Sequence, residues 1–342
     1  MLTIQQDQTI VLDAGYSGVV WAVAFQADGK HVLGGSDNGI RRWRLADSQE
    51  VGRQAGQELY AISVSKDGKW VVCGTDAGAS VWDAEIQEKD IEVDGQKQVQ
   101  AVDVSPDSTR FATGTLDGEG SIWSITTGER LVGPLKHYQV NDIRFSPNGE
   151  QIATSGFGIS VRIFDSRNGD QLIDIDTAAC AKLPITPLAW LNDGQQIFVL
   201  SKDSKIKSFA ASTGSQLAES PILDDNHSIS LSGNGRFIAT VADHAISFLD
   251  TSTLAKIGTA IEDSETMWSI ATSSDSSQIA TGRWDGKIIV HNLGNFLPDS
   301  YGPFHVSICP FIGLSDQHHS ISHIDHYIRH PLVRNHDQTK NL

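Results

Sequence analysis

The stretch that decides the fold is VDVSPDSTRFATGTLDGEGSIWS, residues 102–124. It opens with alternating apolar residues, reverses at the phrase SPDS, continues as a β-rich run that ends in small residues, and reverses again at Asp117-Gly118. Alternation with a period of two is typical of half-buried strands, and Asp, Ser and Gly suit tight turns. The stretch therefore predicts three consecutive antiparallel strands.

The same pattern occurs seven times along the chain. The last residue of the first turn marks each copy, and these marks are Gly29, Gly68, Ser108, Gly149, Gly194, Gly235 and Ser276. Successive marks are 39, 40, 41, 45, 41 and 41 residues apart. A repeat of about 40–45 residues has the length of one four-stranded propeller blade. We therefore expect an all-β, seven-bladed β-propeller of four-stranded antiparallel blades.

The seventh copy lacks a fourth strand of its own. After Leu293 the chain runs into GNFLPDSYGP, residues 294–303, where Pro298 and Pro303 discourage pairing within a sheet. The missing pattern occurs instead in TIVLDAG, residues 9–15. We therefore expect an N-terminal strand to complete the last blade, which removes the two open sheet edges of an unclosed array.

The repeats and the remainder of the chain form two parts. Residues 1–293 are expected to form the propeller, and residues 294–342 are a non-repeat tail that holds seven of the 12 histidines. We expect this His-rich tail to be partly disordered or weakly docked. Four of its histidines could share one helical face and bind Zn²⁺, namely His319, His323, His326 and His330. Because a terminal tail seldom supplies the buried contacts that support such a site, we expect no metal site and no cofactor.

The charge balance excludes several classes of partner. The 342-residue chain carries 26 Lys and Arg against 42 Asp and Glu, a net charge of -16, which repels phosphate backbones and anionic membranes.

No run of about 18 apolar residues occurs, and residues 1–13 lack the features of a secretory signal. The three cysteines, Cys73, Cys180 and Cys309, are too widely spaced for a disulfide framework or a CxxC metal site. We therefore expect a cytoplasmic protein that binds neither nucleic acid nor membrane.

Known catalytic motifs are absent from the sequence. It contains no GxSxG, HExxH or GxxxxGKS/T motif, and the similar GRWDGK at residues 282–287 has one spacer residue too few. A hydrolase would need several Asp, Glu or His side chains converging on the central channel, whereas the charged inner-strand residues Asp103, Asp142 and Arg144 are spread over two repeats. We therefore expect no enzymatic activity, with a metal-dependent or channel-based hydrolase as the less favoured alternative.

The repeats resemble the WD-repeat (WD40) family of β-propellers. The residues that carry the resemblance are SPDS at 105–108, SPNG at 146–149, Trp82-Asp83, Phe164-Asp165 and Leu249-Asp250. The resemblance covers residues 9–293, and the sequence as a whole is also similar to WD-repeat domains of fungal proteins. Family members place a Gly-His before the first strand, and this His joins a turn Asp, a Ser or Thr and a strand Trp in a buried network. Only His137 approximates that His, and Gly158 replaces the Asp of the same repeat, so we expect stability to rest on apolar strands and turn glycines.

The resemblance also implies a partner-binding face. In the family, the loops that lead into the inner strands and the second turns of the repeats open on one face, which commonly binds other proteins. The matching positions hold Trp21, Tyr60 and Trp268 before the inner strands, and Phe157 and Trp284 in the second turns. Large exposed aromatic residues anchor many interfaces, so we expect all five to bind a partner. The alternative is that each ring only covers a neighbouring loop.

These patterns together predict a monomeric, non-enzymatic scaffold that binds a protein or peptide partner on the loop face of the propeller. The tryptophans that we expect to be structural are Trp43, Trp82, Trp123 and Trp190. An alternative is that the chain is the sensor or ligand-recognition end of a larger multidomain protein, because its composition changes abruptly after Leu293.

Overall fold

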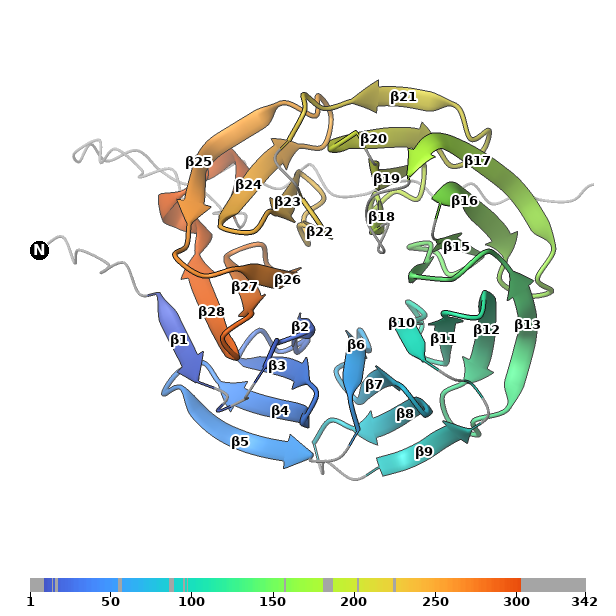
Figure 1. Ribbon diagram of the computed structural model, residues 1–342, viewed down its shortest axis with the longest axis horizontal. Helices are drawn as coiled ribbons and strands as arrows, with labels where there is room; N and C mark the ends of the chain where they lie inside the picture. Colours follow the sequence, from blue (N-terminus) through green and yellow to red (C-terminus); the bar gives the residue numbers. More distant parts are fainter. Residues whose placement is uncertain are drawn as a thin grey trace, which may run out of the picture. The chain divides into compact units, whose positions relative to one another are not determined.

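The computed structural model describes residues 9–302, apart from 14, 16–17, 55–56, 86–88, 95, 97, 157, 181–186, 202 and 224–225. Within this part, 28 strands form seven four-stranded antiparallel sheets, arranged as blades around a central opening (Figure 1). The prediction of a seven-bladed propeller is confirmed. Residues 303–342, which hold the tail histidines, lie outside the described residues.

Blades one to three take their strands in chain order from the channel to the outer edge (Figure 1). Blade one contains β2 (Ala22–Phe25), β3 (His31–Ser36), β4 (Gly39–Arg44) and β5 (Gln49–Gln54). Blade two contains β6 (Leu59–Val64), β7 (Trp70–Thr75), β8 (Gly78–Asp83) and β9 (Lys89–Asp94). Blade three contains β10 (Val99–Val104), β11 (Arg110–Thr115), β12 (Glu119–Ser124) and β13 (Arg130–Lys136).

Blades four to six repeat this order, and blade seven departs from it in its outer strand. Blade four contains β14 (Asp142–Phe145), β15 (Gln151–Ser155), β16 (Gly158–Asp165) and β17 (Gln171–Cys180). Blade five contains β18 (Leu188–Trp190), β19 (Gln196–Ser201), β20 (Lys205–Ala210) and β21 (Gln216–Glu219). Blade six contains β22 (Ser228–Leu231), β23 (Phe237–Val241), β24 (Ala245–Asp250) and β25 (Lys256–Glu262). Blade seven contains β26 (Met267–Thr272), β27 (Gln278–Arg283), β28 (Lys287–Asn292) and, outermost, β1 (Ile10–Asp13).

Strand β1 closes the ring, as the sequence predicts. It pairs antiparallel with β28, with Ile10 opposite Val290 and Leu12 opposite Ile288. The Leu12 side chain is only 1% exposed and belongs to the core cluster that also contains Trp43 of blade one. The N-terminal strand therefore completes the sheet of the last repeat, and it covers the edge of β28 that would otherwise be open to another chain.

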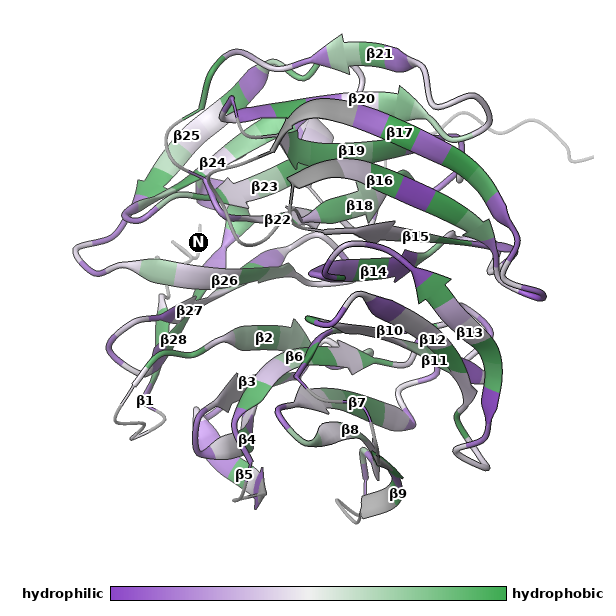
Figure 2. Cartoon of the chain, turned by 45° about the vertical axis from the view of Figure 1, so that its right-hand side comes forward, coloured by the Kyte–Doolittle hydropathy of each residue, from purple (hydrophilic) through white to green (hydrophobic). Residues whose placement is uncertain are grey.

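The blades pack on one another through apolar side chains. Hydrophobic and hydrophilic residues alternate along outer strands such as β13 and β17, as expected for strands with one face in water (Figure 2). The spacing between blades is tight, because a Cβ atom on Gly35 would lie 2.2 Å from Leu59 Cδ2 of the next blade. Trp43, Trp123 and Trp190 are buried in these cores, as expected, and so is Trp70. Trp82, which was also expected to be structural, packs against the core between blades one and two but is only partly buried.

Blade three contains a buried polar network that the sequence reading missed. Trp123 Nε1 donates to Thr113 Oγ1 (2.9 Å), and Thr113 donates to Gln96 Oε1 in the loop before β10 (2.6 Å). Gln96 thus takes the role of the family's histidine, because an amide oxygen also accepts a hydroxyl hydrogen bond. In blade six, Thr240 Oγ1 donates to Asn226 Oδ1 in a similar way (2.8 Å). The expectation that stability rests only on apolar strands and turn glycines is therefore wrong for these two blades.

Polar side chains on the inner strands join several neighbouring blades. Ser63, Asp103 and Ser230 share one repeat position, and each accepts from a backbone N–H of the neighbouring inner strand. The donors are Val104 (3.2 Å), Phe145 (2.8 Å) and Thr272 (3.0 Å), respectively. Arg144 occupies this position on β14 and cannot accept, so Asp142 Oδ2 accepts from Leu188 N instead (2.9 Å). These bonds link blades two to five and blades six and seven along the channel wall.

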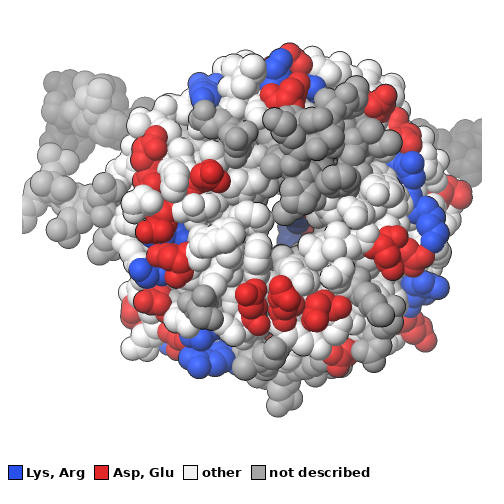
Figure 3. All heavy atoms as spheres, viewed as in Figure 1, with Lys and Arg blue, Asp and Glu red and all other residues white. Residues whose placement is uncertain are grey.

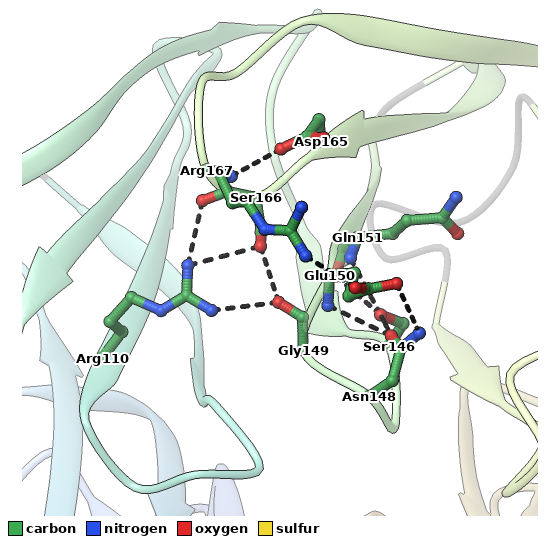
Figure 4. A network of polar contacts seen from close by, with 9 residues as sticks. All are labelled: Arg110, Ser146, Asn148, Gly149, Glu150, Gln151, Asp165, Ser166 and Arg167. Atoms are coloured by element: carbon green, nitrogen blue, oxygen red, sulfur yellow. Dashed lines mark hydrogen bonds and ion pairs between the residues drawn. The ribbon is translucent and has the colours of Figure 1, made fainter. Parts of the chain in front are cut away.

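Arg110 joins blades three and four near their outer turns (Figure 4). Its Nη2 donates to Gly149 O (2.9 Å) and its Nη1 donates to Ser166 O (3.0 Å). Ser166 Oγ also donates to Gly149 O (2.6 Å), so one guanidinium holds two turns of blade four together. Arg167 lies nearby and pairs with Glu150 (2.6 Å), but both of these side chains are more than half exposed.

The substitution Arg110→Met is expected to lower the free energy of unfolding by about 1–3 kcal/mol, because two carbonyl groups lose a charged donor. Arg167→Met is the matched control, since exposed ion pairs contribute at most about 1 kcal/mol. Urea unfolding of both variants measures the difference. Equal losses for the two variants would show that Arg110 does not join the blades.

The segment beyond the last repeat strand packs on blade six. It forms two short 3-10 helices, η1 (Leu293–Asn295) and η2 (Asp299–Tyr301). Thr259 N in β25 donates to Phe296 O (2.8 Å), and Tyr301 Oη donates to Asp250 Oδ2 at the end of β24 (2.8 Å). Residues 294–302 are thus held by blade six through both backbone and side-chain contacts.

Candidate partner-binding site

The loop face consists of the loops that lead into the inner strands and the turns between the second and third strands of the blades. Trp21 lies just before β2, Tyr60 lies in β6 and Trp268 lies in β26, each two residues before the Val or Ile that anchors its inner strand. Trp284 lies in the turn between β27 and β28. Because β2 contacts both β26 and β6, the closed ring places these four residues on neighbouring blades (Figure 1).

Three of the tryptophans form one group of touching rings. The centroid of the Trp268 ring lies 5.3 Å from the Trp21 centroid and 5.9 Å from the Trp284 centroid. The interplanar angles are 89° and 68°, respectively. Edge-to-face pairs of this kind are favourable because the positive edge of one ring meets the negative face of the other. We call Trp21, Trp268, Trp284 and the adjoining His227 the aromatic cluster. It spans blades six, seven and one.

His227 is a member of the aromatic cluster that the sequence reading missed. The centroid of its ring lies 5.3 Å from the Trp268 centroid, with an interplanar angle of 31°, and its Nε2 is 2.7 Å from Met267 O. It stands two residues before Ile229, the same repeat position as Trp21 and Trp268. The repeat register therefore marks this position in the sequence, where an imidazole stands in place of a larger aromatic ring.

The aromatic cluster is open to solvent on one side. Trp21 and Trp268 are partly buried, whereas Trp284 is 53% exposed. The Trp284 turn is braced, because its backbone N donates to Thr266 O (2.8 Å) and the neighbouring Arg283 pairs with Asp285 (3.0 Å). Phe157, the fifth residue expected at the site, lies outside the described residues.

Carboxylates surround Trp21 and Tyr60. Asp37 accepts a hydrogen bond from Trp21 Nε1. Burial, together with the carboxylates of Glu58, Asp76 and Asp37, raises the pKa of Tyr60 to about 12. Figure 3 shows acidic side chains gathered beside the central opening on the side of blades one and two. Among the described residues Tyr60 has no ring contact with the aromatic cluster, and Asp37 is the residue that lies between them.

The structure brings together three charged channel residues that the sequence reading placed apart. Arg144 Nε lies 3.0 Å from Asp142 Oδ1, and Arg144 Nη1 lies 3.7 Å from Asp103 Oδ1. They lie on two blades, as expected, but they meet because β10 and β14 are adjacent inner strands. Both carboxylates also accept backbone hydrogen bonds from the next blade, so they already have structural partners. Burial raises the pKa of Asp103 to about 6, although Arg144 opposes that shift.

Asp103 should make stability depend on pH. Its folded-state pKa of about 6 exceeds the value of about 3.9 for an unfolded Asp, so the folded protein holds this proton more tightly. The stabilising effect is complete below about pH 4 and is lost as the pH rises through about 6. The wild type should lose this stabilisation between pH 4 and pH 7, whereas Asp103→Asn should not. The difference in unfolding free energy, variant minus wild type, should therefore rise by about 1–3 kcal/mol from pH 4 to pH 7. Chemical unfolding at both pH values measures this gain, and parallel pH profiles would contradict the shift.

Within the described ranges, no group of three or more His, Cys, Asp or Glu side chains could hold a metal ion. The same ranges contain no helix that is long and apolar enough to cross a membrane. The four tail histidines considered above for Zn²⁺ lie beyond residue 302 and outside the described part of the chain.

The repeats match a known family. The model of the WD domain, G-beta repeat, matches residues 7–44, 50–83, 89–124, 130–165 and 257–292, which together make up more than half of the chain. Blade five and most of blade six lie between the last two matched segments, yet they have the same four-strand order as the other blades. The chain belongs to the WD40 repeat family.

Proposed function

We propose that this protein is a monomeric, non-enzymatic scaffold that binds a protein or peptide partner through the aromatic cluster and Tyr60 of the adjacent blade two, and that Phe157 also contacts the partner. WD40 propellers commonly serve as scaffolds for protein interactions. The observation that carries the proposal is the meeting of Trp21, Trp268 and Trp284 in one solvent-open group across two blades. A rigid closed ring holds such a group in place before the partner arrives, which lowers the entropy cost of binding.

The composition of the site favours a protein partner. Trp rings supply large contact areas and lose little conformational entropy on binding, which is why they dominate many interfaces. Around the cluster lie polar groups, including the exposed Asp37 and the largely buried Arg283–Asp285 pair. An apolar centre within a polar rim is the usual anatomy of a protein interface. The net charge of -16 disfavours nucleic acid as the partner.

The rings of the aromatic cluster differ from the tryptophans that build the core. Trp43 is 2% exposed and contacts the apolar residues between blades, whereas Trp284 is 53% exposed. Burying an exposed ring of this size against a partner would remove apolar area from water that folding has left exposed. Removal of this apolar area from water therefore makes a favourable contribution to the free energy of binding.

The test is affinity capture followed by direct binding measurements. The triple variant Trp21→Ala/Trp268→Ala/Trp284→Ala should lose a partner that the wild type captures from cell extract. The control is Leu131→Ala/Leu172→Ala/Leu217→Ala, which removes three similarly exposed apolar side chains from the outer strands β13, β17 and β21. If the aromatic triple variant captures and binds the same partner as the control, the proposed site is wrong.

A further inference from the structure

The turns between the second and third strands of blades one and two are shorter than those of four other blades. The turn between β3 and β4 has two residues and begins with Asp37, and the turn between β7 and β8 has two residues and begins with Asp76. The corresponding turns of blades three, five, six and seven have three residues, with an Asp in the middle. In blades one and two the Asp therefore directly follows the last residue of the strand, and it is exposed in both.

The longer turns of blades three, five and seven use their Asp within the blade. Its carboxylate accepts from a Ser or Thr hydroxyl or pairs with a cation; the pairs are Thr115–Asp117, Ser201–Asp203, Lys207–Asp203 and Arg283–Asp285. Among the described residues, Asp37 and Asp76 form no such bond with a Ser, Thr, Lys or Arg. The shorter turns thus leave these two carboxylates without a cation of their own blade.

A third exposed carboxylate, that of Glu58, lies between the two short turns, in the loop before β6. On one side, its neighbour Leu59 packs against blade one, where a Cβ atom on Gly35 would lie 2.2 Å from Leu59 Cδ2. On the other side, its neighbour Gln57 accepts from Thr75 Oγ1 at the end of β7 (3.0 Å). Figure 3 shows the resulting row of acidic side chains beside the central opening.

These three carboxylates adjoin the aromatic cluster. We call Asp37, Glu58 and Asp76 the acidic row. Trp21 Nε1 donates to Asp37, so the acidic row and the aromatic cluster share one surface. All three carboxylates also act on the Tyr60 hydroxyl, whose pKa they raise to about 12 together with burial, the larger cause. The surface proposed to bind a partner is therefore apolar on blades seven and one and anionic on blades one and two.

The cations of blade seven beside Trp284 are already paired. Arg283 pairs with Asp263 (3.3 Å) and Asp285 (3.0 Å), and Lys287 pairs with Asp285 (3.3 Å). They therefore do not neutralise the acidic row. An acidic partner would be repelled by this row, and a neutral one would remove water from carboxylates without replacing its hydrogen bonds. Lys or Arg side chains would instead pair with the carboxylates, and a guanidinium or ammonium group is also attracted to the face of a Trp ring.

We propose that the partner segment is basic: an extended peptide that places an apolar side chain against Trp268 and Trp284 and its Lys or Arg side chains on the acidic row. This inference rests on the proposed function, because it names the chemistry of the partner that the aromatic cluster binds. The net charge of -16 attracts any basic molecule from a distance, whereas the acidic row requires the positive charges at one place on the loop face.

Fluorescence anisotropy with a panel of short labelled peptides tests the requirement for positive charge. Each peptide carries two Arg or two Lys side chains and one Leu or Phe, and the panel varies their spacing. The best binder should lose affinity as salt is added, and citrulline in place of Arg, or acetyl-lysine in place of Lys, should weaken it at least about tenfold. Failure of every basic peptide to bind, or equal affinity of the charged and neutral forms, would overturn the proposal.

Neutralising the acidic row locates the effect on the protein. Asp37→Asn/Glu58→Gln/Asp76→Asn keeps an oxygen at each position, so the hydrogen bond from Trp21 can persist and the variant should fold as the wild type does. It should bind the best basic peptide at least about tenfold more weakly, with a smaller dependence on salt. Circular dichroism and thermal unfolding verify that the variant is folded.

The matched control is Glu85→Gln/Glu129→Gln/Asp193→Asn, which changes the net charge by the same amount. These exposed residues lie in turns between the first and second or the third and fourth strands. Because successive strands of a blade are antiparallel, such turns lie on the face opposite the loop face. The control should bind the peptide as the wild type does. Equal losses in the two triple variants would show that only the net charge matters and would overturn the proposal.

The aromatic triple variant separates this inference from the proposed function. If it loses the captured partner while neutralisation of the acidic row changes nothing, the aromatic cluster binds a partner that is not basic, and only this inference is wrong. If neither triple variant weakens binding, both proposals are wrong. Weaker binding in both variants, with the opposite-face control unchanged, supports both.

Discussion

Deletion of residues 1–13 is expected to lower the melting temperature by about 10 °C and to make the protein self-associate. The deletion removes β1, and with it Leu12, which is buried in the cluster that contains Trp43. Loss of a buried Leu alone costs about 2–5 kcal/mol, loss of the paired strand adds to this, and each kcal/mol shifts the melting temperature of a chain of this length by about 1–2 °C. The edge of β28 that pairs with Ile10 and Leu12 becomes exposed, which invites pairing with a second molecule.

Deletion of residues 1–8 is the control for this experiment, because it shortens the chain but leaves β1 (Ile10–Asp13) in place. Leu12→Ala separates side-chain packing from strand pairing and should give a smaller loss than the deletion. Differential scanning calorimetry and light scattering measure stability and molecular mass. If the protein lacking residues 1–13 keeps its melting temperature and stays monomeric, β1 does not close the ring in solution.

The fold was predictable because the propeller repeats one short-range pattern. Each copy contains its own turn signals and strand alternation, so the number of blades follows from counting copies. Closure by β1 was also predictable, since Pro298 and Pro303 exclude a strand after β28 and Ile10–Asp13 has the missing alternation. Polar substitutes such as Gln96 were missed, because a loop residue that bonds to Thr113 follows no fixed spacing from it.

The contacts of the site were less predictable than its position. The repeat register placed Trp21 and Trp268 at equivalent positions, but the ring contact between them depends on how blades seven and one meet after closure. The Asp103–Arg144–Asp142 group was misjudged for a similar reason, since residues about 40 apart in the sequence lie side by side in adjacent blades.

Trp268→Ala is expected to weaken partner binding by about 2–4 kcal/mol, roughly a 30- to 1,000-fold loss of affinity. The Trp268 ring touches Trp21, Trp284 and His227, so its removal both deletes an anchor and releases the rings on either side. Its effect on folding should be smaller than that of Trp123→Ala, which empties a buried site and should cost about 3–5 kcal/mol of unfolding free energy. Trp123 is a better reference than Trp82, because Trp82 is only partly buried.

Trp284→Ala gives the sharpest separation of binding from folding. The side chain is 53% exposed, so its loss should change the unfolding free energy by no more than about 0.5 kcal/mol while still weakening binding. Leu217→Ala is the control, since Leu217 is 52% exposed but lies on the outer strand β21 of blade five, two blades from blade seven. Isothermal titration calorimetry and urea unfolding measure the two quantities. If Trp284→Ala binds the partner as tightly as Leu217→Ala, and Trp268→Ala unfolds as readily as Trp123→Ala, the aromatic cluster holds the fold together rather than binding a partner.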